Sequence, residues 1–594
     1  MLKKAIVCLT LLCLLLFTSL HYQVEQTSAT VLDEFPISGE TLIVDSDSIL
    51  TISEGETVEC AGELIIQPNE GSLEVEIINY GTLKFSNFVN CTSSLLVITN
   101  YGTLLFKNAL VELTGEYGKV ELSNNGNLQI ENSTFDGNFG GTFSIISAVG
   151  DLTVTDSHFD ISGSSQGKIS ELTVISSNST WEKCTFTGVG GKIDYLNSGS
   201  LTYHNVQIHL SGFSNATIRN EDTLAMQGVN IQVYAGYMYI HNNGTLNAHN
   251  LYIKDQNDGT SLTNYKDAFF SESTFVANGA TGKIEFFSSG NLLIHHGVFD
   301  GNYGGTLNIN TATGSLNVSD SSFDVSGASH GKNSNLNIIG SNASWADCTF
   351  VNNAAQISYL NTGELELTNC AIQNVGTSTF TVLTSSGPMV FEKAQISGSG
   401  SISITCWEPS KLKDCTFNSS KSLTLFNNNE LTVENWLVKT TDSTASISIF
   451  NTENSTLIFD KSFIEGVSVE TLTAIGPKGQ QFTEASGGTI TVTNNGEMQV
   501  QSNPQPSPEP TPTPTTQTTP SPTQTPQTSP QGSPEPTQTS QATPEVTQTP
   551  QSTQNSIEGI SDSNFISIIA IVAAIFIAVI LILVVRKKQA SKSK

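Results

Sequence analysis

The sequence predicts an all-β fold, a right-handed parallel β-helix solenoid of about twenty rungs of 21–27 residues. A phrase of the form Leu-x-apolar-x-Asn/Asp-x-x-apolar recurs, and its leucines are spaced by one, two or three multiples of 21–25 residues. Two long segments of the chain are copies of one another. The units have the alternating apolar residues and the Asn-Gly and Ser-Gly turns of strands, with no helical period before the C-terminal apolar run. A fixed period of this size indicates stacked turns.

The duplicated segments are residues 102–209 and 266–373. A gapless alignment of 126–209 with 290–373 has about half of its positions identical, and "FDGNFGG" in the first copy is "FDGNYGG" in the second. Because no gap separates the copies, the length of each turn matters to the fold. In this motif we expect Phe to point into the core, Asp-Gly-Asn to form a turn, and the paired Gly to start the next strand tightly.

The repeats predict two ladders of stacked side chains. Leucine-rich repeats have a similar period, but they need a helical or 3₁₀ return segment, and both halves of these units resemble strands. The expected inward ladder consists of Val111, Phe135, Phe159, Phe186, Ile208, Ile231, Ile253, Phe275, Phe299, Phe323, Phe350, Ile372, Ile396 and Phe417. The expected amide ladder at a turn consists of Asn87, Asn108, Asn132, Asn205, Asn250, Asn369 and Asn435.

The segments on either side of the solenoid predict a cell-surface protein. Residues 1–29 have the basic start, apolar core and small-residue end of a secretory signal peptide, with an uncleaved signal anchor as the alternative. Residues 30–502 are the expected ectodomain, and residues 503–560 form a Pro, Thr, Ser and Gln-rich stalk that cannot bury apolar surface. The uncharged run 565–585 suits a transmembrane helix, and the basic tail 586–594 places the C-terminus in the cytoplasm. These features predict a single-pass type I membrane protein.

The charge of the chain limits its partners. Between residues 30 and 585 there are 18 Lys or Arg and 53 Asp or Glu, a net charge of −35, and Arg219 is the one arginine. Nucleic acids need basic surfaces, so we expect no nucleic-acid partner. The membrane is the expected partner, together with surface glycans or other surface proteins.

The motif "TFDGNFGGTFSI" and its copy "VFDGNYGGTLNI" resemble the FxxN and GGA(I/L/V) repeats of the chlamydial polymorphic outer membrane proteins. More broadly, the repeats resemble parallel β-helix adhesins and polysaccharide lyases. The resemblance covers about residues 40–500 and implies the fold more than the function. Thr142 and Thr306 replace the Ala of the family motif, and a membrane span replaces its C-terminal autotransporter barrel. This departure favours a single-membrane archaeal or a protist surface.

Two pairs of aspartates are candidate cation ligands. Asp136 and Asp160 follow consecutive ladder residues, and Asp300 and Asp324 repeat the arrangement. The residues of a pair should lie about 5 Å apart across one rung. An exposed hydrophilic turn, which the sequence favours, a Ca²⁺ site and a catalytic pair are the three alternatives; no cofactor is required by the sequence, and calcium is the one candidate.

Three tyrosines are candidate ligand-binding residues. Tyr234, Tyr237 and Tyr239, together with His241, could form an aromatic strip for sugar stacking, with simple packing as the alternative. His295 and His296 are adjacent, but the sequence gives no further converging ligand, so we expect an exposed turn.

The cysteines and sequons allow two covalent modifications. Seven Cys follow the signal peptide, and Cys348 and Cys370 should face inward on successive rungs, as a disulfide or as two buried thiols. Asn-x-Ser/Thr sequons, which a chain so rich in these residues also contains by chance, predict glycosylation at Asn90, Asn132, Asn178, Asn215, Asn243, Asn317, Asn342, Asn418 and Asn454.

The sequence favours a structural or adhesive rod that binds glycans or neighbouring surfaces. A membrane-tethered polysaccharide lyase or glycoside hydrolase is the alternative. The lyases that the chain resembles use Arg or Lys, and the hydrolases show Asp-Asp, NTD and GHG signatures. The chain has none of these three signatures and one ectodomain Arg, so we expect no enzyme activity of the known types.

Overall fold

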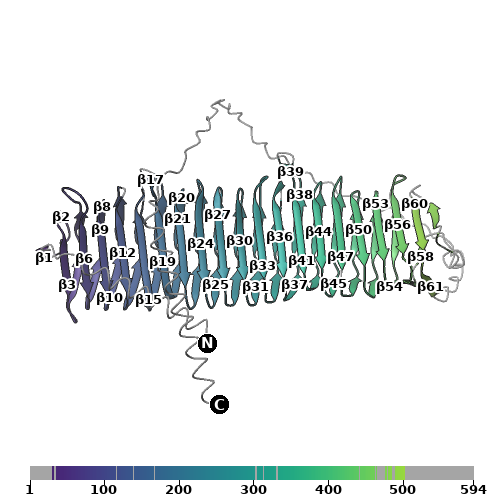
Figure 1. The fold of residues 1–594 in the computed structure, drawn as a ribbon, viewed down its shortest axis with the longest axis horizontal. Coiled ribbons are helices and arrows are strands. Elements are labelled where there is room, and N and C mark those ends of the chain that lie inside the picture. The colour runs from purple at the N-terminus through teal and green to yellow at the C-terminus, as the bar shows by residue number, and fades with distance from the viewer. Residues whose placement is uncertain are drawn as a thin grey trace, which may run out of the picture. The chain divides into compact units, whose positions relative to one another are not determined.

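The computed structural model describes residues 30–31 and 35–501, except for 116, 138–139, 166–167, 302–303, 312, 330–331, 385, 420, 441, 462, 465–474, 476, 478 and 484–488. The described residues form an all-β parallel solenoid of about 17 turns without a helix (Figure 1), where the sequence predicted about twenty rungs. None of the described segments is a helix that could cross a membrane. The predicted signal peptide, stalk, membrane helix and basic tail lie outside the described residues.

Each turn contributes one strand to each of three columns of parallel strands. Column A runs from β4 (Thr57–Cys60) to β61 (Glu497–Gln501), where the Leu-x-apolar phrase lies. Column B, which contains the predicted inward ladder, runs from β2 (Thr41–Val44) to β58 (Phe463–Ile464). Column C runs from β1 (Thr30–Val31), which pairs with β3 (Ser48–Ile52), to β60 (Thr489–Asn494).

One central turn shows the arrangement of the three strands. It consists of β25 (Leu224–Gln227) in column A, β26 (Asn230–Val233) in column B and β27 (Gly236–Asn242) in column C. In two other turns a single strand passes from column C into column A: β15 (Thr142–Thr155) and β19 (Glu171–Glu182). Within each column the strands pair in parallel with their counterparts in the neighbouring turns, with one register shift between Ser147 and Asp151 of β15, so equivalent residues of successive turns stack.

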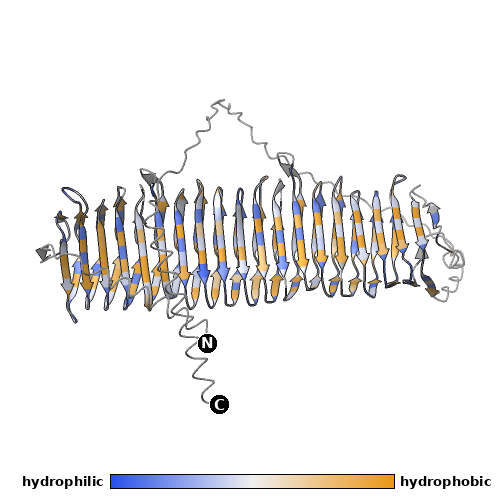
Figure 2. Ribbon diagram, in the orientation of Figure 1, coloured by the Kyte–Doolittle hydropathy of each residue, from blue (hydrophilic) through white to orange (hydrophobic). Residues whose placement is uncertain are grey.

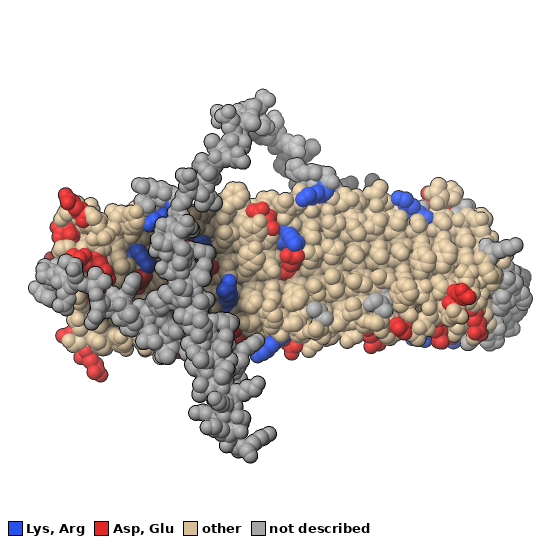
Figure 3. Space-filling view, viewed as in Figure 1, with Lys and Arg blue, Asp and Glu red and all other residues tan. Residues whose placement is uncertain are grey.

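Alternating burial follows from the two-residue period of a strand. In β27 every second residue, from Gly236 to Asn242, is buried, and the residues between them face outward. Figure 2 shows this alternation as bands of opposite hydropathy along the strands. Figure 3 shows one face of the solenoid, on which charged side chains are sparse and the acidic ones gather at the left end and along the lower edge.

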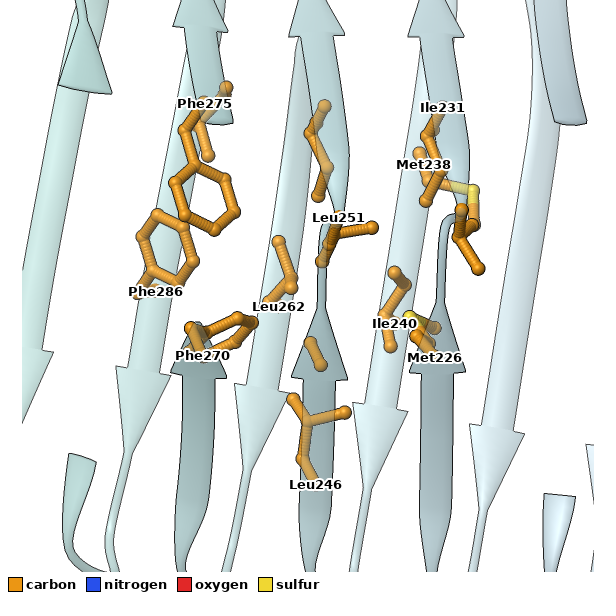
Figure 4. Close-up of a cluster of buried hydrophobic side chains, with 14 of the residues drawn as sticks. Met226, Ile231, Met238, Ile240, Leu246, Leu251, Leu262, Phe270, Phe275 and Phe286 are labelled. Carbon is orange, nitrogen blue, oxygen red and sulfur yellow. The ribbon is translucent and has the colours of Figure 1, made fainter. Parts of the chain in front are cut away.

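The predicted inward ladder is confirmed over its whole length. All of its residues are buried, and each pairs in register with the next, from Val111 to Phe417. The rings of Phe299 and Phe323 stack with centroids 4.5 Å apart, and Phe159 and Phe186 stack at 5.3 Å. Figure 4 shows the same stacking of apolar side chains in the central turns. Burying one such side chain contributes about 1.5–3 kcal/mol.

The duplicated segments repeat individual hydrogen bonds as well as residues. The indole Nε1 of Trp181 donates to the hydroxyl of Tyr195 at 2.9 Å, and Trp345 donates to Tyr359 at the same distance. Each copy also carries a short antiparallel hairpin at the corner between columns B and C: β17 (Ser164–Ser165) with β18 (Lys168–Ile169), and β39 (Ala328–Ser329) with β40 (Lys332–Asn333).

The double glycine of the FDGN motif is required by the backbone. Gly140 and Gly304 have φ of +89° and +91°, a conformation that favours glycine. At Gly141 a Cβ atom would lie 2.5 Å from the Cβ of Leu113, and at Gly305 it would lie 1.9 Å from the carbonyl oxygen of Ala277. The turn therefore has no space for a side chain at the residue that immediately precedes the next strand.

The expected amide ladder is present only in part. Asn132 donates to the side chain of Asn108 at 2.7 Å, but Asn369 and Asn435 donate to Asp347 and Asp414. Except for Asn87, the seven predicted residues have positive φ. They stand at the exposed turn between columns A and B, where the chain also uses Asp, Lys, Glu and His, so their amides do not form a continuous row.

A buried amide ladder instead lies at the turn between columns C and A. Its side-chain bonds are 2.6–2.8 Å long, and it joins Asn79, Asn100, Asn124 and Ser147 in one run, Ser176, Asn197, Asn220, Asn242 and Asn264 in a second, and Asn427, Asn451 and Asn494 in a third. A buried amide is stable only when it is hydrogen-bonded, so this ladder fixes the vertical alignment of the turns.

Candidate functional site

An outward-facing groove of about 560 Å³ lies along the central turns of column C. It runs across β30 (Gly259–Asn264), β33 (Lys283–Ser288), β36 (Thr306–Thr311), β41 (Asn335–Gly340) and β44 (Gln356–Asn361). Two rows of stacked side chains line it. The polar row is Ser261, Glu285, Asn308, Asn337 and Ser358. The mainly apolar row beside it is Phe287, Asn310, Ile339 and Leu360.

The polar row is a chain of hydrogen bonds across successive turns. Asn337 Nδ2 donates to Asn308 Oδ1 at 2.8 Å, and Asn308 Nδ2 donates to Glu285 Oε1 at 2.9 Å. The Lys283 ammonium lies 2.8 Å from Glu285 Oε1. Each amide has one more N–H and a second carbonyl lone pair for a ligand, so the row offers donors and acceptors at the spacing of the turns, about 4.8 Å.

The apolar row gives the groove a hydrophobic side. Phe287 and Ile339 lie inside strands and are 36% and 40% exposed. They occupy outward positions of β33 and β41 because the alternation in these strands places Phe286 and Ile338 in the core. A polar row beside an apolar row can bind a molecule with hydroxyl groups on its edges and apolar faces.

The predicted tyrosine strip is partly assembled. Tyr237 and Tyr239 both point outward from β27, and their rings stack with centroids 6.1 Å apart. Tyr239 pairs in register with Ser261, so the polar row of the groove continues into this strip. Tyr234 lies instead at the corner before β27, where its hydroxyl donates to Gln232 Oε1 at 2.6 Å. All three tyrosines are 41–46% exposed.

The two aspartate pairs lie in register, as predicted. Asp136 is beside Asp160, and Asp300 is beside Asp324, on the outer face of column B. All four side chains are half-buried; Oδ1 of Asp160 has no hydrogen-bond partner in the described part of the chain, whereas Ser326 donates to Asp324. Asp160 of the first pair and Asp300 of the second are six turns apart, so the pairs form two separate sites. Calcium binding there stays a prediction.

Cys348 and Cys370 are inward-facing and stacked, as predicted. Like the other five Cys of the described chain, they are buried free thiols. A hydrogen bond with Cys370, together with burial, holds the pKa of the Cys348 thiol well above its ordinary value. Each thiol also donates to nearby backbone carbonyls, as in the bond from Cys348 to Ala346 at 3.2 Å. Their oxidation to a disulfide stays a prediction.

Of the nine predicted glycosylation acceptors, six are exposed, and Asn90, Asn243 and Asn418 are half-buried. Asn132, Asn178, Asn215, Asn317 and Asn342 are among the exposed ones, and the described structure buries none of the nine. A glycan could therefore be attached at each sequon without displacing the core.

The sequence analysis missed one chemically distinctive residue, Asp255, and the third member, Asp320, of a cluster whose two histidines it had noted. Asp255 lies at an inward position of column B; burial raises its pKa to about 7, although Thr260 and the backbone N–H of Lys283 donate to its carboxylate. Asp255 lies two residues after the inward ladder residue Ile253, and this spacing, which places it on the inward face of the strand, is the signal that could have revealed its burial. His295 and His296 are joined by Asp320 from the next turn. The twenty-four-residue spacing from His296 to Asp320, one period of the repeat, was the available signal.

Comparisons with protein families, curated proteins and solved structures find no match for this chain.

Proposed function

We propose that this chain is a cell-surface rod with a structural or adhesive role, anchored by one C-terminal membrane span, and that column C binds glycans or neighbouring surfaces. The observation that carries this proposal is the groove, in which a hydrogen-bonded polar row adjoins an apolar row and continues into two exposed tyrosines. A right-handed winding, a cleaved signal peptide and glycosylation of the ectodomain are parts of the same proposal.

The side chains of the groove match the chemistry of a sugar polymer. Amide and carboxylate groups of the polar row exchange hydrogen bonds with hydroxyls, while Phe287 and Tyr239 offer surfaces for the apolar faces of sugar rings. Because column C repeats these groups turn after turn, a linear polymer could make the same contact several times. Glu285 and the net negative charge favour neutral polymers over uronate-rich ones.

Binding of the full-length chain to immobilised polysaccharides tests this proposal. We expect the double variant Tyr237→Ala/Tyr239→Ala to lose at least about tenfold in affinity, because stacking on an aromatic ring contributes about 1 kcal/mol or more per ring. Tyr80 and Tyr101 provide a matched control, since their rings stack 5.0 Å apart and are also half-exposed but lie outside the groove. Equal binding by the two double variants would remove the tyrosine strip from the proposal.

A polysaccharide-cleaving enzyme is the second candidate, and the in-register aspartate pairs are the observation that favours it. Two carboxylates about 5 Å apart suit the geometry of a retaining glycosidase. New chain ends released from any polymer, and abolished by Asp160→Asn or Asp324→Asn, would make this function primary.

A further inference from the structure

The corner between columns A and B brings two histidines and one aspartate together. His295 is the last residue of β34 (Leu292–His295), and His296 follows it with φ of 52°. This left-handed conformation places the two imidazole rings side by side, with centroids 3.8 Å apart. Asp320 occupies the equivalent left-handed position one turn later, with φ of 50°.

We propose that His295, His296 and Asp320 bind a divalent transition-metal ion, with Zn²⁺ as the representative ion. One ligand atom from each residue lies within 4.8 Å of the other two, and His295 Nδ1 lies 3.4 Å from Asp320 Oδ2. Bonds of about 2.0–2.1 Å in a tetrahedral site place neighbouring ligand atoms about 3.3 Å apart. The existing geometry therefore needs only small side-chain rotations.

The donor set selects the class of metal. Two imidazole nitrogens and one carboxylate oxygen are the ligands that zinc, copper and nickel accept, whereas Ca²⁺ takes six to eight oxygens. Three protein ligands leave a fourth position for water or for a group from outside, as in open zinc sites. The side chains of His296 and Asp320 are exposed, so an ion reaches them directly.

The backbone under the ligands is fixed by bonds between turns. The N–H of His296 donates to the carbonyl of Ser319 at 3.1 Å, and the N–H of Asp320 donates to the carbonyl of Ala346 at 3.0 Å. The hydroxyl of Ser319 lies 2.8 Å from His295 Nδ1, and an ion bound at that nitrogen would replace this hydrogen bond. Because the ligands come from two turns, a bound ion joins the turns and stabilises the folded solenoid.

The same edge contains a simpler histidine and acid pair that serves as an internal control. His204 Nδ1 lies 4.0 Å from Glu182 Oε1, with one imidazole and one carboxylate. His204 ends its column A strand as His295 does, and the equivalent position is Ser in other turns, for example Ser271 and Ser319. His295→Ser and His204→Ser are therefore matched substitutions that the backbone accepts.

The test is a titration of the chelator-treated full-length chain, without a histidine tag, with Zn²⁺ and with Co²⁺ at pH 7.5. We expect one Zn²⁺ to be bound in competition with a chromophoric chelator, visible Co²⁺ absorption, and a melting temperature that rises with Zn²⁺. His295→Ser and Asp320→Asn should each weaken binding by at least about tenfold, the loss that even an outer partner of a metal ligand causes.

The outcome separates a metal site from a solvated ion pair. Binding retained in His204→Ser and lost in His295→Ser and Asp320→Asn supports the site, and circular dichroism of each variant shows whether it is folded. Absence of Zn²⁺ binding to the natural chain, or equal affinity in all variants, overturns the proposal. Because this corner lies outside the groove, polysaccharide binding without added metal is expected to be the same in His295→Ser and in the natural chain.

Discussion

The buried carboxyl of Asp255 predicts a specific dependence of stability on pH. Asp255 ends β29 (Tyr252–Asp255) and is fully buried. Burial is the main cause that raises its pKa to about 7 from the ordinary 3.8, and the nearby carboxylate of Asp258 acts in the same direction. Hydrogen bonds from Thr260 at 2.8 Å and from the N–H of Lys283 at 3.2 Å oppose the shift only in part.

The sign follows from the order in which the two states ionise. Below pH 3.8 the carboxyl is neutral in both the folded and the unfolded chain, so its contribution to stability is fully present. Between pH 3.8 and about 7 the unfolded chain is ionised first, and the free energy of unfolding falls. A shift of about 3 pKa units corresponds to about 4 kcal/mol at about 1.36 kcal/mol per unit.

Asp255→Asn removes this loss because an amide does not ionise. The variant gives up one hydrogen bond, at a cost of about 1 kcal/mol, so it should be about 3 kcal/mol more stable than the natural chain at pH 8 and similar to it near pH 4. Urea unfolding of the full-length chain at both pH values measures this, with fluorescence of the four Trp, which all lie in the solenoid. Asp151→Asn, at an exposed position, is the control. An Asn variant that is no more stable than the natural chain at pH 8 would refute the reasoning.

Three further changes test the fold and its cation sites. Gly305→Ala should destabilise the solenoid by several kcal/mol, because the new Cβ would lie 1.9 Å from the carbonyl oxygen of Ala277. Gly301→Ala is the control and should cost much less, because the nearest atom to its new Cβ is 3.4 Å away. The melting temperatures of the two variants measure the difference. Asn220→Ala should cost about 2–6 kcal/mol in urea unfolding, because it leaves two buried ladder partners unsatisfied at about 1–3 kcal/mol each. If the aspartate pairs bind Ca²⁺, the calcium chelator EGTA should lower the melting temperature, and an unchanged value would remove that site.

The sequence predicted the inward ladder because each of its residues follows a phrase that repeats with the period of one turn. It did not reveal the buried amide ladder. Asn occurs both at the exposed left-handed turn and at the buried corner, and the residue type alone does not say which amide faces inward. Asn220 and Asn205, for example, belong to the same turn, but only Asn220 is buried.

The candidate site was predicted less completely than the core. Tyr237 and Tyr239 are two residues apart in one strand, so their common face followed from the strand period. The groove joins residues from five turns, and Phe287 and Ile339 follow other apolar residues directly, which makes them look like core residues in the sequence. The outward position of such residues depends on the register between turns, which only the structure supplies.

The most direct test of the proposed function exposes the full-length chain to a panel of neutral and uronate polysaccharides, with and without Ca²⁺. Retention of each polymer and release of new chain ends are measured on the same samples. The account predicts that the chain retains neutral polymers and releases no new ends. Release of new ends from any polymer, or failure to retain a single one, would contradict a glycan-binding rod.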